Sequence, residues 1–311
     1  MPFNKLASFR KVNSLDAEIR GAALCGAEGL VAMVSTDPVR LATNATTGAN
    51  AKVTNCSLSG ADDVVLLNRH AALVRSSDHA VWALLDLTNK AKIDEVSRDV
   101  RLLRACPAGN AALGIAWDGS GVHYSAAKTD VEARPFQLRG EVRAADLTDT
   151  ECWVVAEGEA GGQLRVHQGV TPEPGAVLRA NLPAEAKALD RLRVSPRLAV
   201  LYKPGGMSCC IATGAPNVLR ARMVRLEGKP VDLAVMETSL FALYEDGRVA
   251  LYDSDAINAS AEGGALVAKH TMPTGGGLPR VLLTVVRGPA MLWVGTARGE
   301  VMMANVGRKT S

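Results

Sequence analysis

Apolar and polar residues alternate along most of the chain, in pairs of short runs that are separated by a polar turn. The clearest pair is SLFALYEDGRVALYD, residues 239–253, in which two alternating runs flank Glu-Asp-Gly. A period of two is typical of strands that bury one face, and Asp-Gly between two such runs predicts a hairpin. Similar blocks begin at residues 29, 70, 111, 151, 197 and 290, so the chain has seven hairpin candidates.

The turns of these hairpins are regularly spaced. They begin at Thr36, Ser77, Asp118, Glu157, Lys203, Glu245 and Thr296, at spacings of 41, 41, 39, 46, 42 and 51 residues. Independent hairpins would have no common spacing, whereas a repeat of about 40–50 residues with strand periodicity in each unit is typical of propeller blades. The sequence therefore predicts an all-β fold, a seven-bladed β-propeller.

Further short apolar runs flank each hairpin, and they supply four strands per unit. DDVVLLN precedes the second hairpin and KAKIDEV follows it. A lone hairpin would leave its apolar faces exposed, whereas four-stranded sheets stacked around a ring bury both faces. We therefore expect four-stranded antiparallel blades in one domain over residues 1–311, with no separate second domain.

The two ends of the chain are expected to meet. The last hairpin ends at Asn305, and the six residues that follow are too few for an outer strand in the seventh blade. KLASFRKV, residues 5–12, lies ahead of the first inner-strand candidate, EIRGAALC. Because an open ring would expose a sheet edge, we predict that this N-terminal strand completes the last blade.

Two departures from the strand pattern are expected. PAEAKAL, residues 183–189, favours a short turn of helix after a proline-rich loop. The longest spacing, 51 residues, is attributed to an enlarged connection between the sixth and seventh blades, EGGALVAKHTMPTGGGLP, residues 262–279. Loops of unusual length are often functional, so this segment is a candidate partner contact as well as a flexible insertion.

Some hairpins resemble WD-repeat units, in which an Asp-Gly turn is followed by a strand that ends in an aromatic residue and aspartate. YEDGRVALYD, residues 244–253, has both features, and SSDHAVWALLD, residues 76–86, has Asp78 in the turn and Asp86 at the strand end. AWDGSGVHYSA, residues 116–126, has the Asp-Gly turn alone. The Gly-His dipeptides of the family are missing. The chain is therefore similar to a divergent WD-repeat-like propeller.

The composition favours a globular intracellular protein. Hydrophobic residues make up 48% of the chain, and the net charge of +3 does not indicate a strongly charged partner. The six cysteines form no CxxC pair, so we expect reduced, buried thiols. We expect no signal peptide, membrane span or mitochondrial presequence, and a cytoplasmic or nuclear location.

Residues that could carry catalysis are scarce. The five histidines are scattered, no G-x-S-x-G occurs, and the glycines at 275–277 lack the GK[ST] ending of a phosphate-binding loop. The inner-strand candidates EIRGAALC, VRLLRAC and PRVLLTVV contain few possible ligands for a metal ion on the axis. We expect no enzymatic activity and no cofactor or metal. The alternative is a hydrolase or lactonase-like propeller with an axial metal ion.

Residues 134–229 form a basic arc, with 14 lysines and arginines against 10 acids. Within it, Arg220 and Arg222 share one face of NVLRARMVRL, with Arg225 nearby. Charges on an outer strand discourage pairing between sheet edges, and we favour this edge protection as the role of these arginines. An acidic protein partner and RNA are alternatives, although no aromatic residue is interleaved for base stacking.

These observations predict a non-catalytic protein-interaction scaffold, a subunit of a multiprotein complex that binds one or more proteins. In WD-like propellers, the turns between second and third strands lie on the same side as the inter-blade connections. The resemblance therefore implies the following partner-facing set: Asp78, His79, Trp117, Asp118, Tyr202, Lys203, Asp246 and Arg298. Of the four tryptophans, three are expected between blades, whereas Trp117 borders a turn and is a candidate hot spot.

Overall fold

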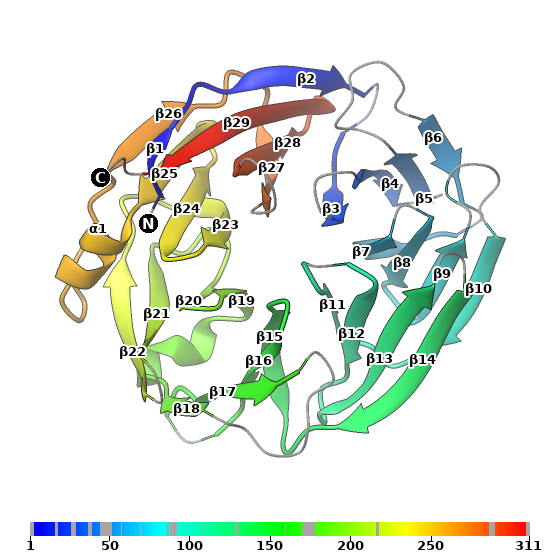
Figure 1. Ribbon diagram of the computed structural model, residues 1–311, viewed down its shortest axis with the longest axis horizontal. Coiled ribbons are helices and arrows are strands. Elements are labelled where there is room, and N and C mark those ends of the chain that lie inside the picture. The colour runs from blue at the N-terminus through cyan, green and yellow to red at the C-terminus, as the bar shows by residue number, and fades with distance from the viewer. Residues whose placement is uncertain are drawn as a thin grey trace.

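The computed structural model describes residues 3–15, 18–25, 29–36, 39–43, 52–56, 58–68, 70–85, 87, 92–107, 109–127, 130–158, 160–169, 178–215, 218–285 and 290–308. In this part of the chain, seven antiparallel sheets surround a central axis, as Figure 1 shows. Six sheets have four strands that run in chain order from the axis outward. The all-β, seven-bladed fold that the spacing predicts is therefore confirmed.

The strands of the first three blades are as follows. They are β3 (Gly21–Cys25), β4 (Gly29–Thr36), β5 (Val39–Thr43) and β6 (Lys52–Asn55); β7 (Ala61–Asn68), β8 (Ala71–Ser76), β9 (Val81–Leu85) and β10 (Lys92–Ser97); and β11 (Leu102–Ala105), β12 (Ala111–Ile115), β13 (Ser120–Ala127) and β14 (Asp130–Gln137).

The next three blades repeat this order. They are β15 (Val142–Leu147), β16 (Glu151–Ala156), β17 (Gln163–Gln168) and β18 (Leu178–Asn181); β19 (Arg191–Ser195), β20 (Leu198–Tyr202), β21 (Ser208–Ala215) and β22 (Val218–Arg225); and β23 (Pro230–Met236), β24 (Ser239–Tyr244), β25 (Arg248–Tyr252) and β26 (His270–Pro273). The short 3-10 helix η1 (Ala184–Ala188) lies where PAEAKAL predicts a turn of helix.

The seventh blade joins the two ends of the chain. It contains β27 (Pro279–Val285), β28 (Met291–Thr296) and β29 (Glu300–Arg308) from the C-terminal part. Two N-terminal strands, β1 (Phe3–Leu6) and β2 (Arg10–Ser14), pair with β29 one after the other. The predicted closure by the N-terminal segment is confirmed, with two short strands in place of the single strand expected over residues 5–12.

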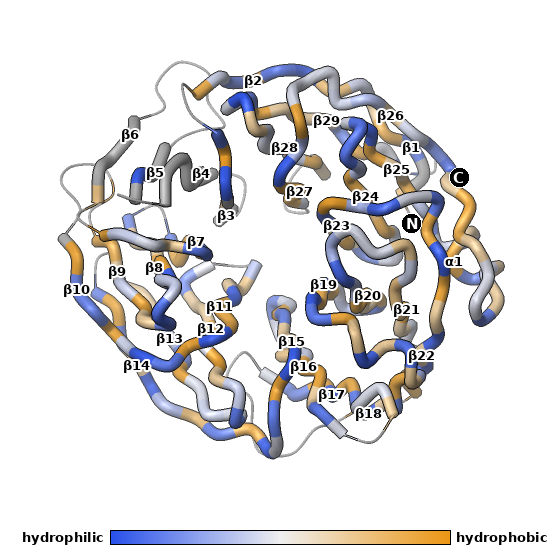
Figure 2. Tube along the Cα trace, turned by 180° about the vertical axis from the view of Figure 1, so that it is seen from behind, coloured by the Kyte–Doolittle hydropathy of each residue, from blue (hydrophilic) through white to orange (hydrophobic). Residues whose placement is uncertain are grey.

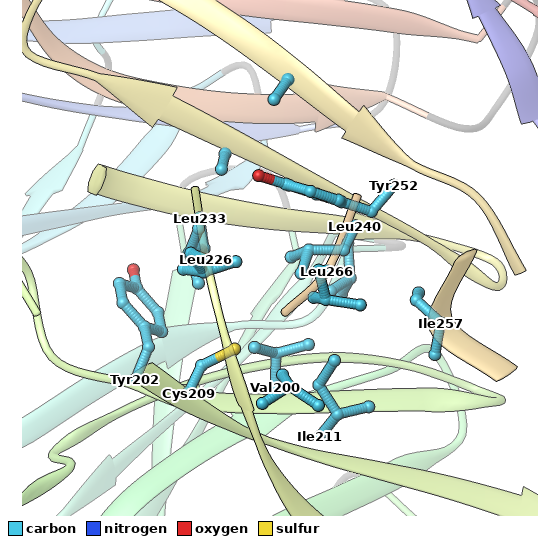
Figure 3. Close-up of a cluster of buried hydrophobic side chains, with 14 of the residues drawn as sticks. Val200, Tyr202, Cys209, Ile211, Leu226, Leu233, Leu240, Tyr252, Ile257 and Leu266 are labelled. Atoms are coloured by element: carbon cyan, nitrogen blue, oxygen red, sulfur yellow. The ribbon is translucent and has the colours of Figure 1, made fainter. Parts of the chain in front are cut away.

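The hydrophobic core consists of layers between adjacent blades. In the layer between the fifth and sixth blades, Tyr202 and Cys209 face Leu233 and Tyr252 (Figure 3). The neighbouring Cys210 belongs to the layer on the other side of β21. Because successive strand residues point to opposite faces, each sheet contributes to two layers and both of its faces are buried.

The described cysteine side chains are buried and form no disulfide, as the sequence predicts. Burial raises the pKa of the Cys56 thiol to about 11. Burial also raises the pKa of the thiols of Cys152, Cys209 and Cys210. These four thiols therefore remain protonated at neutral pH and act as small apolar side chains.

The outer strands carry the polar residues. Along β14 most side chains are exposed, and the tube along β10 and β14 alternates between hydrophilic and hydrophobic colours in Figure 2. Since an outer strand has one unpaired edge, polar and charged side chains there discourage pairing with other molecules.

The longest repeat spacing has a different origin from the one predicted. The extra residues lie mainly between β25 and β26, inside the sixth blade, and include α1 (Ser254–Ala259). Asp253, at the end of a WD-like strand, accepts a hydrogen bond from the Ala256 amide and caps this helix. The sequence analysis missed α1 because the segment reads as the end of a strand followed by a glycine-rich loop.

The same insertion covers the edge of the fifth blade. The amide of Arg225, in the outer strand β22, donates to the carbonyl of Gly264, and the amide of Leu266 donates to the carbonyl of Arg225. Arg222 also donates to the carbonyl of Ile257 and to the Ser260 hydroxyl. The predicted edge protection of β22 therefore comes partly from backbone pairing, and Arg222 anchors the insertion.

Phe3 provides a test of ring closure. Its side chain is fully buried between the sixth and seventh blades, and the Ser239 hydroxyl donates to its carbonyl. Replacing a buried phenylalanine with alanine leaves a cavity, so Phe3→Ala should lower the free energy of unfolding by about 3–5 kcal/mol in urea denaturation.

The control is Lys5→Ala, which alters an exposed side chain on the same strand and should change stability by less than about 0.5 kcal/mol. Equal stability of the two variants would show that β1 does not hold the ring closed.

Candidate functional site on the propeller axis and the turn face

Charged side chains alternate in sign around the axis on successive inner strands. We call this set the axial belt, and its members are Asp63 on β7, Arg104 on β11, Asp146 on β15, Arg193 on β19 and Asp232 on β23. They follow one another at 41, 42, 47 and 39 residues, which is the blade repeat. Each blade from the second to the sixth therefore contributes one charged residue.

The belt arginines donate to the backbone of the next blade. Arg104 Nε lies 3.0 Å from the carbonyl oxygen of Ala145 on the fourth blade. Arg193 Nε lies 3.1 Å from the carbonyl oxygen of Leu233 on the sixth blade. The inner strand has no partner strand on its axial side, and these side chains satisfy carbonyls that would otherwise need water.

The belt aspartates accept from the backbone of the next blade in the same way. Asp146 Oδ2 accepts from the Val194 amide at 2.9 Å, and Asp232 Oδ2 accepts from the Leu282 amide at 3.0 Å. A donor side chain on one blade is therefore followed by an acceptor side chain on the next. This alternation links the third to the seventh blade through direct hydrogen bonds.

Ion pairs strengthen the belt at both ends. Asp63 pairs with Arg104 at 3.3 Å, and Asp232 pairs with Arg193 at 3.4 Å. Asp232 Oδ1 also accepts from the hydroxyl of Tyr202 at 2.6 Å and from the Leu233 amide at 3.0 Å. A buried carboxylate is stable only when such donors replace water, so Asp232 is the most fully satisfied member of the belt.

Asp146 lies between the two belt arginines but has fewer donors. Burial raises the pKa of its carboxyl group, and the charges of Arg193 and Arg104 only partly oppose this effect. Its remaining exposure is to the cavity on the axis, which it lines. Asp146 therefore binds protons more readily in the folded protein than in the unfolded chain.

A cavity of about 560 Å³ occupies the axis. Most of the belt lines this cavity, and the residues around its mouth lie in turns, in inter-blade connections or near the strand ends beside them. The mouth residues are Asp62, Arg75, His79, Arg101, Arg143, Asp190 and Arg191. Charged groups therefore line the cavity both at the belt and at the mouth.

The turns and the connections lie on one side of the ring, which we call the turn face. The carbonyl of His79, in the turn of the second blade, accepts from the Val100 amide in the connection that follows. In the same way, the carbonyl of Trp117 accepts from the Val142 amide, and the carbonyl of Gly247 accepts from the Thr274 amide. The geometry expected from the resemblance to WD-like propellers is therefore present, and in these three blades the turn is held by the connection that follows it.

Most of the predicted partner-facing set is exposed on the turn face. Its exposed members are Asp78, His79, Trp117, Asp118, Lys203, Asp246 and Arg298. Tyr202 is the exception, because its side chain has 0% exposure and its hydroxyl donates to Asp232. Its placement in the set is corrected: it ends β20 just before the turn and points into the core.

The aspartates of the turns have a structural role. Asp118 Oδ1 accepts from the amide and the hydroxyl of Ser120, and Asp246 Oδ1 accepts from the Arg248 amide. The Ser120 hydroxyl bond is the main reason that the pKa of Asp118 lies below its usual range. These aspartates stabilise their turns by bonding to the residue two positions on, which is the usual function of aspartate there. Asp86 lies outside the described residues.

Trp117 differs from the other tryptophans as expected. Trp153 and Trp293 are buried between blades, whereas Trp117 is 39% exposed on the turn face. The guanidinium carbon of Arg101 lies 3.9 Å from the centre of its ring. Tryptophan is the best partner for such a cation–π contact, so the two side chains hold each other in place at the mouth of the cavity.

The axial belt was missed by the sequence analysis. The inner strands were considered there only as sources of metal ligands, and three of them contain few acids. The signal that could have found the belt is a single charge of alternating sign, recurring at the blade repeat within runs that are otherwise apolar. Such charges are rarely buried without a partner, so each one indicates a bond to a neighbouring blade.

No protein-family profile matches the sequence, and no curated protein matches it significantly. The likeness to solved structures is nevertheless extensive. The N-terminal domain of Nup159 superposes with a TM-score of 0.61 at 11% identity, covering 98% of this chain and 96% of that one. The chain is a β-propeller.

Two further structures support this assignment. One is a complex of S. cerevisiae Dbp5 bound to Nup159, Gle1, IP6 and ADP, with a TM-score of 0.61 at 11% identity over 99% of this chain and 96% of that one. The other is the computationally designed Ika8 protein, with a TM-score of 0.59 at 11% identity over 95% and 99%. At this identity the likeness concerns the fold alone.

The belt predicts a large effect of removing Asp232. In Asp232→Ala, the guanidinium of Arg193, the Leu282 amide and the Tyr202 hydroxyl lose a buried acceptor. Breaking a buried ion pair in this way should lower the free energy of unfolding by about 3–5 kcal/mol in urea denaturation. Asp130→Ala, on the exposed outer strand β14, is the control and should stay within about 0.5 kcal/mol of wild type.

Asp146 should behave differently. Asp146→Asn keeps an oxygen that can accept from the Val194 amide, so it should be tolerated better than Asp146→Ala, which loses about 1–3 kcal/mol. Because the folded pKa is raised, the folded state binds more protons just above the pKa of the unfolded chain. Wild-type stability relative to Asp146→Asn should therefore rise as the pH falls through the raised pKa. Urea titrations at several pH values measure this difference, and the opposite slope would contradict the assignment.

Proposed function

We propose that the protein is a non-catalytic interaction scaffold that binds other proteins through its turn face, as a subunit of a larger assembly. The observation that carries this proposal is the distribution of exposed apolar side chains. Of the five large apolar residues that are exposed in the described part of the chain, three lie on turns or inter-blade connections of the turn face: Trp117, Met207 and Leu278, at 39%, 41% and 63% exposure. The other two, Val218 and Val267, lie at the start of β22 and in the sixth-blade insertion. Exposed apolar groups on a rigid surface are typical of interaction sites.

The rigidity of that surface supports the same function. In the second, third and sixth blades the turn is hydrogen-bonded to the connection that follows it, so a partner would meet loops there that are already ordered. A partner that binds such a surface avoids most of the entropic cost of ordering it. The Nup159 structure in a complex with Dbp5 and Gle1 is an example of a propeller fold in a protein assembly.

A propeller enzyme with an axial metal ion is less well supported. In the described part of the ring, Asp63, Asp146 and Asp232 accept hydrogen bonds from backbone amides, and two of them also pair with arginines. Within that same part, no three His, Cys, Asp or Glu residues lie close enough to hold a metal ion. The axial acids are therefore better explained as links between blades.

An RNA-binding function of the basic arc has less support as well. Arg222 anchors the insertion of the sixth blade, and the insertion pairs with the backbone of Arg225. Part of the charge on β22 is therefore used within the protein.

We also propose a distant kinship with WD-repeat propellers, which the Asp-Gly turns support, and a cytoplasmic or nuclear location. No helix among the described residues is long and apolar enough to cross a membrane.

Trp117→Ala tests the proposal. Affinity purification of the tagged wild-type protein, followed by mass spectrometry, should recover specific proteins, and Trp117→Ala should lose them because a hot-spot side chain is removed. Val267→Ala, which alters an exposed apolar residue of the sixth-blade insertion away from the turn face, is the matched control. Retention of every partner by folded Trp117→Ala would count against the turn face as the binding surface.

A further inference from the structure

We propose that the mouth of the axial cavity, on the turn face, binds an acidic segment of the partner protein. This inference rests on the proposed scaffold function and specifies the place of binding and the chemistry of the partner. Three features of the mouth support it: its charge, its free hydrogen-bond donors and one exposed aromatic ring.

The positive charge of the cavity is concentrated at its mouth. In the belt, three aspartates face two arginines, and these groups pair with one another or with backbone. The mouth has the opposite excess, since it holds four arginines and two aspartates. A ligand that enters from the turn face therefore meets positive charge first, which favours an acidic group.

Two of the mouth arginines are available to a ligand. Arg101 and Arg191 are exposed, and neither forms an ion pair with another described residue. By contrast, Arg75 pairs with Asp62 at 3.0 Å, and Arg143 pairs with Glu157 at 3.2 Å. Carboxylates of an arriving segment would consequently bind Arg101 or Arg191 without breaking an existing ion pair.

Further donors lie deeper in the cavity. Arg104 bonds through Nε and Nη1, and Arg193 bonds through Nε and Nη2. The other terminal nitrogen of each, Nη2 of Arg104 and Nη1 of Arg193, donates to no described residue. Both side chains line the cavity, so an acidic side chain that reaches the belt would find two guanidinium donors.

Trp117 indicates a polypeptide ligand rather than a small anion. Its exposed ring lies against Arg101 at the mouth, and a small inorganic anion would gain nothing from it. A peptide can place a carboxylate on Arg101 and an apolar side chain on Trp117 at the same time. Buried aromatic and arginine contacts are the usual hot spots of protein interfaces.

The experiment uses the full chain and a fluorescein-labelled peptide of alternating glutamate and leucine, with a control peptide that has glutamine in place of glutamate. Fluorescence anisotropy should show saturable binding of the glutamate peptide, which weakens as salt is added, and much weaker binding of the glutamine peptide. Arg101→Gln and Arg191→Gln should each weaken binding about tenfold.

Arg134→Gln provides the matched control, because it removes the same charge from a 68% exposed side chain on the outer strand β14. It should bind the glutamate peptide as wild type does, and thermal melting should show that all three variants are folded. Equal weakening by Arg134→Gln would overturn the assignment to the mouth, since net charge alone would then explain binding.

Three other outcomes would also overturn the inference. They are a lack of saturable binding, equal affinity for the two peptides, and tighter binding of inorganic polyphosphate or single-stranded RNA with the same dependence on Arg101. The proposed scaffold function fails separately. If Trp117→Ala loses its cellular partners while Arg101→Gln retains them, the scaffold function stands and the acidic segment does not.

Discussion

The inner strand of each blade has one edge that no other strand can pair with, and this constraint explains much of the structure. The amides and carbonyls on that edge point toward the axis, where the ring leaves too little room for another strand. Buried backbone groups must nevertheless have hydrogen-bond partners. The axial belt meets this need along the inner strands of the fourth to seventh blades, because its last four charged side chains each reach the backbone of the next inner strand.

The belt also influences what the cavity can bind. Both of its arginines pair with belt aspartates, so the belt holds linked charges while the turn-face mouth keeps a positive excess. The belt mainly links the blades, whereas the proposed binding site lies chiefly at the mouth. There, arginines lie beside Trp117 on loops that hydrogen bonds already hold in place.

Strand periodicity and turn spacing were sufficient to predict the fold and the closure of the ring, because both depend on short-range patterns that repeat. The hairpin SLFALYEDGRVALYD forms β24 and β25 as the pattern predicts. Tyr202 and α1 were not predictable in this way. The burial of Tyr202 depends on Asp232 in the neighbouring blade, and α1 depends on a cap supplied by an aspartate that otherwise reads as the end of a strand.

Hydrogen exchange of single backbone amides tests the central claim, that charged side chains satisfy the free edges of the inner strands. The amides of Val194 and Leu282 point toward the axis and bond to Asp146 and Asp232. The account predicts that they exchange as slowly as amides paired within β20 and β24. Exchange at the rate of exposed edge amides would contradict it.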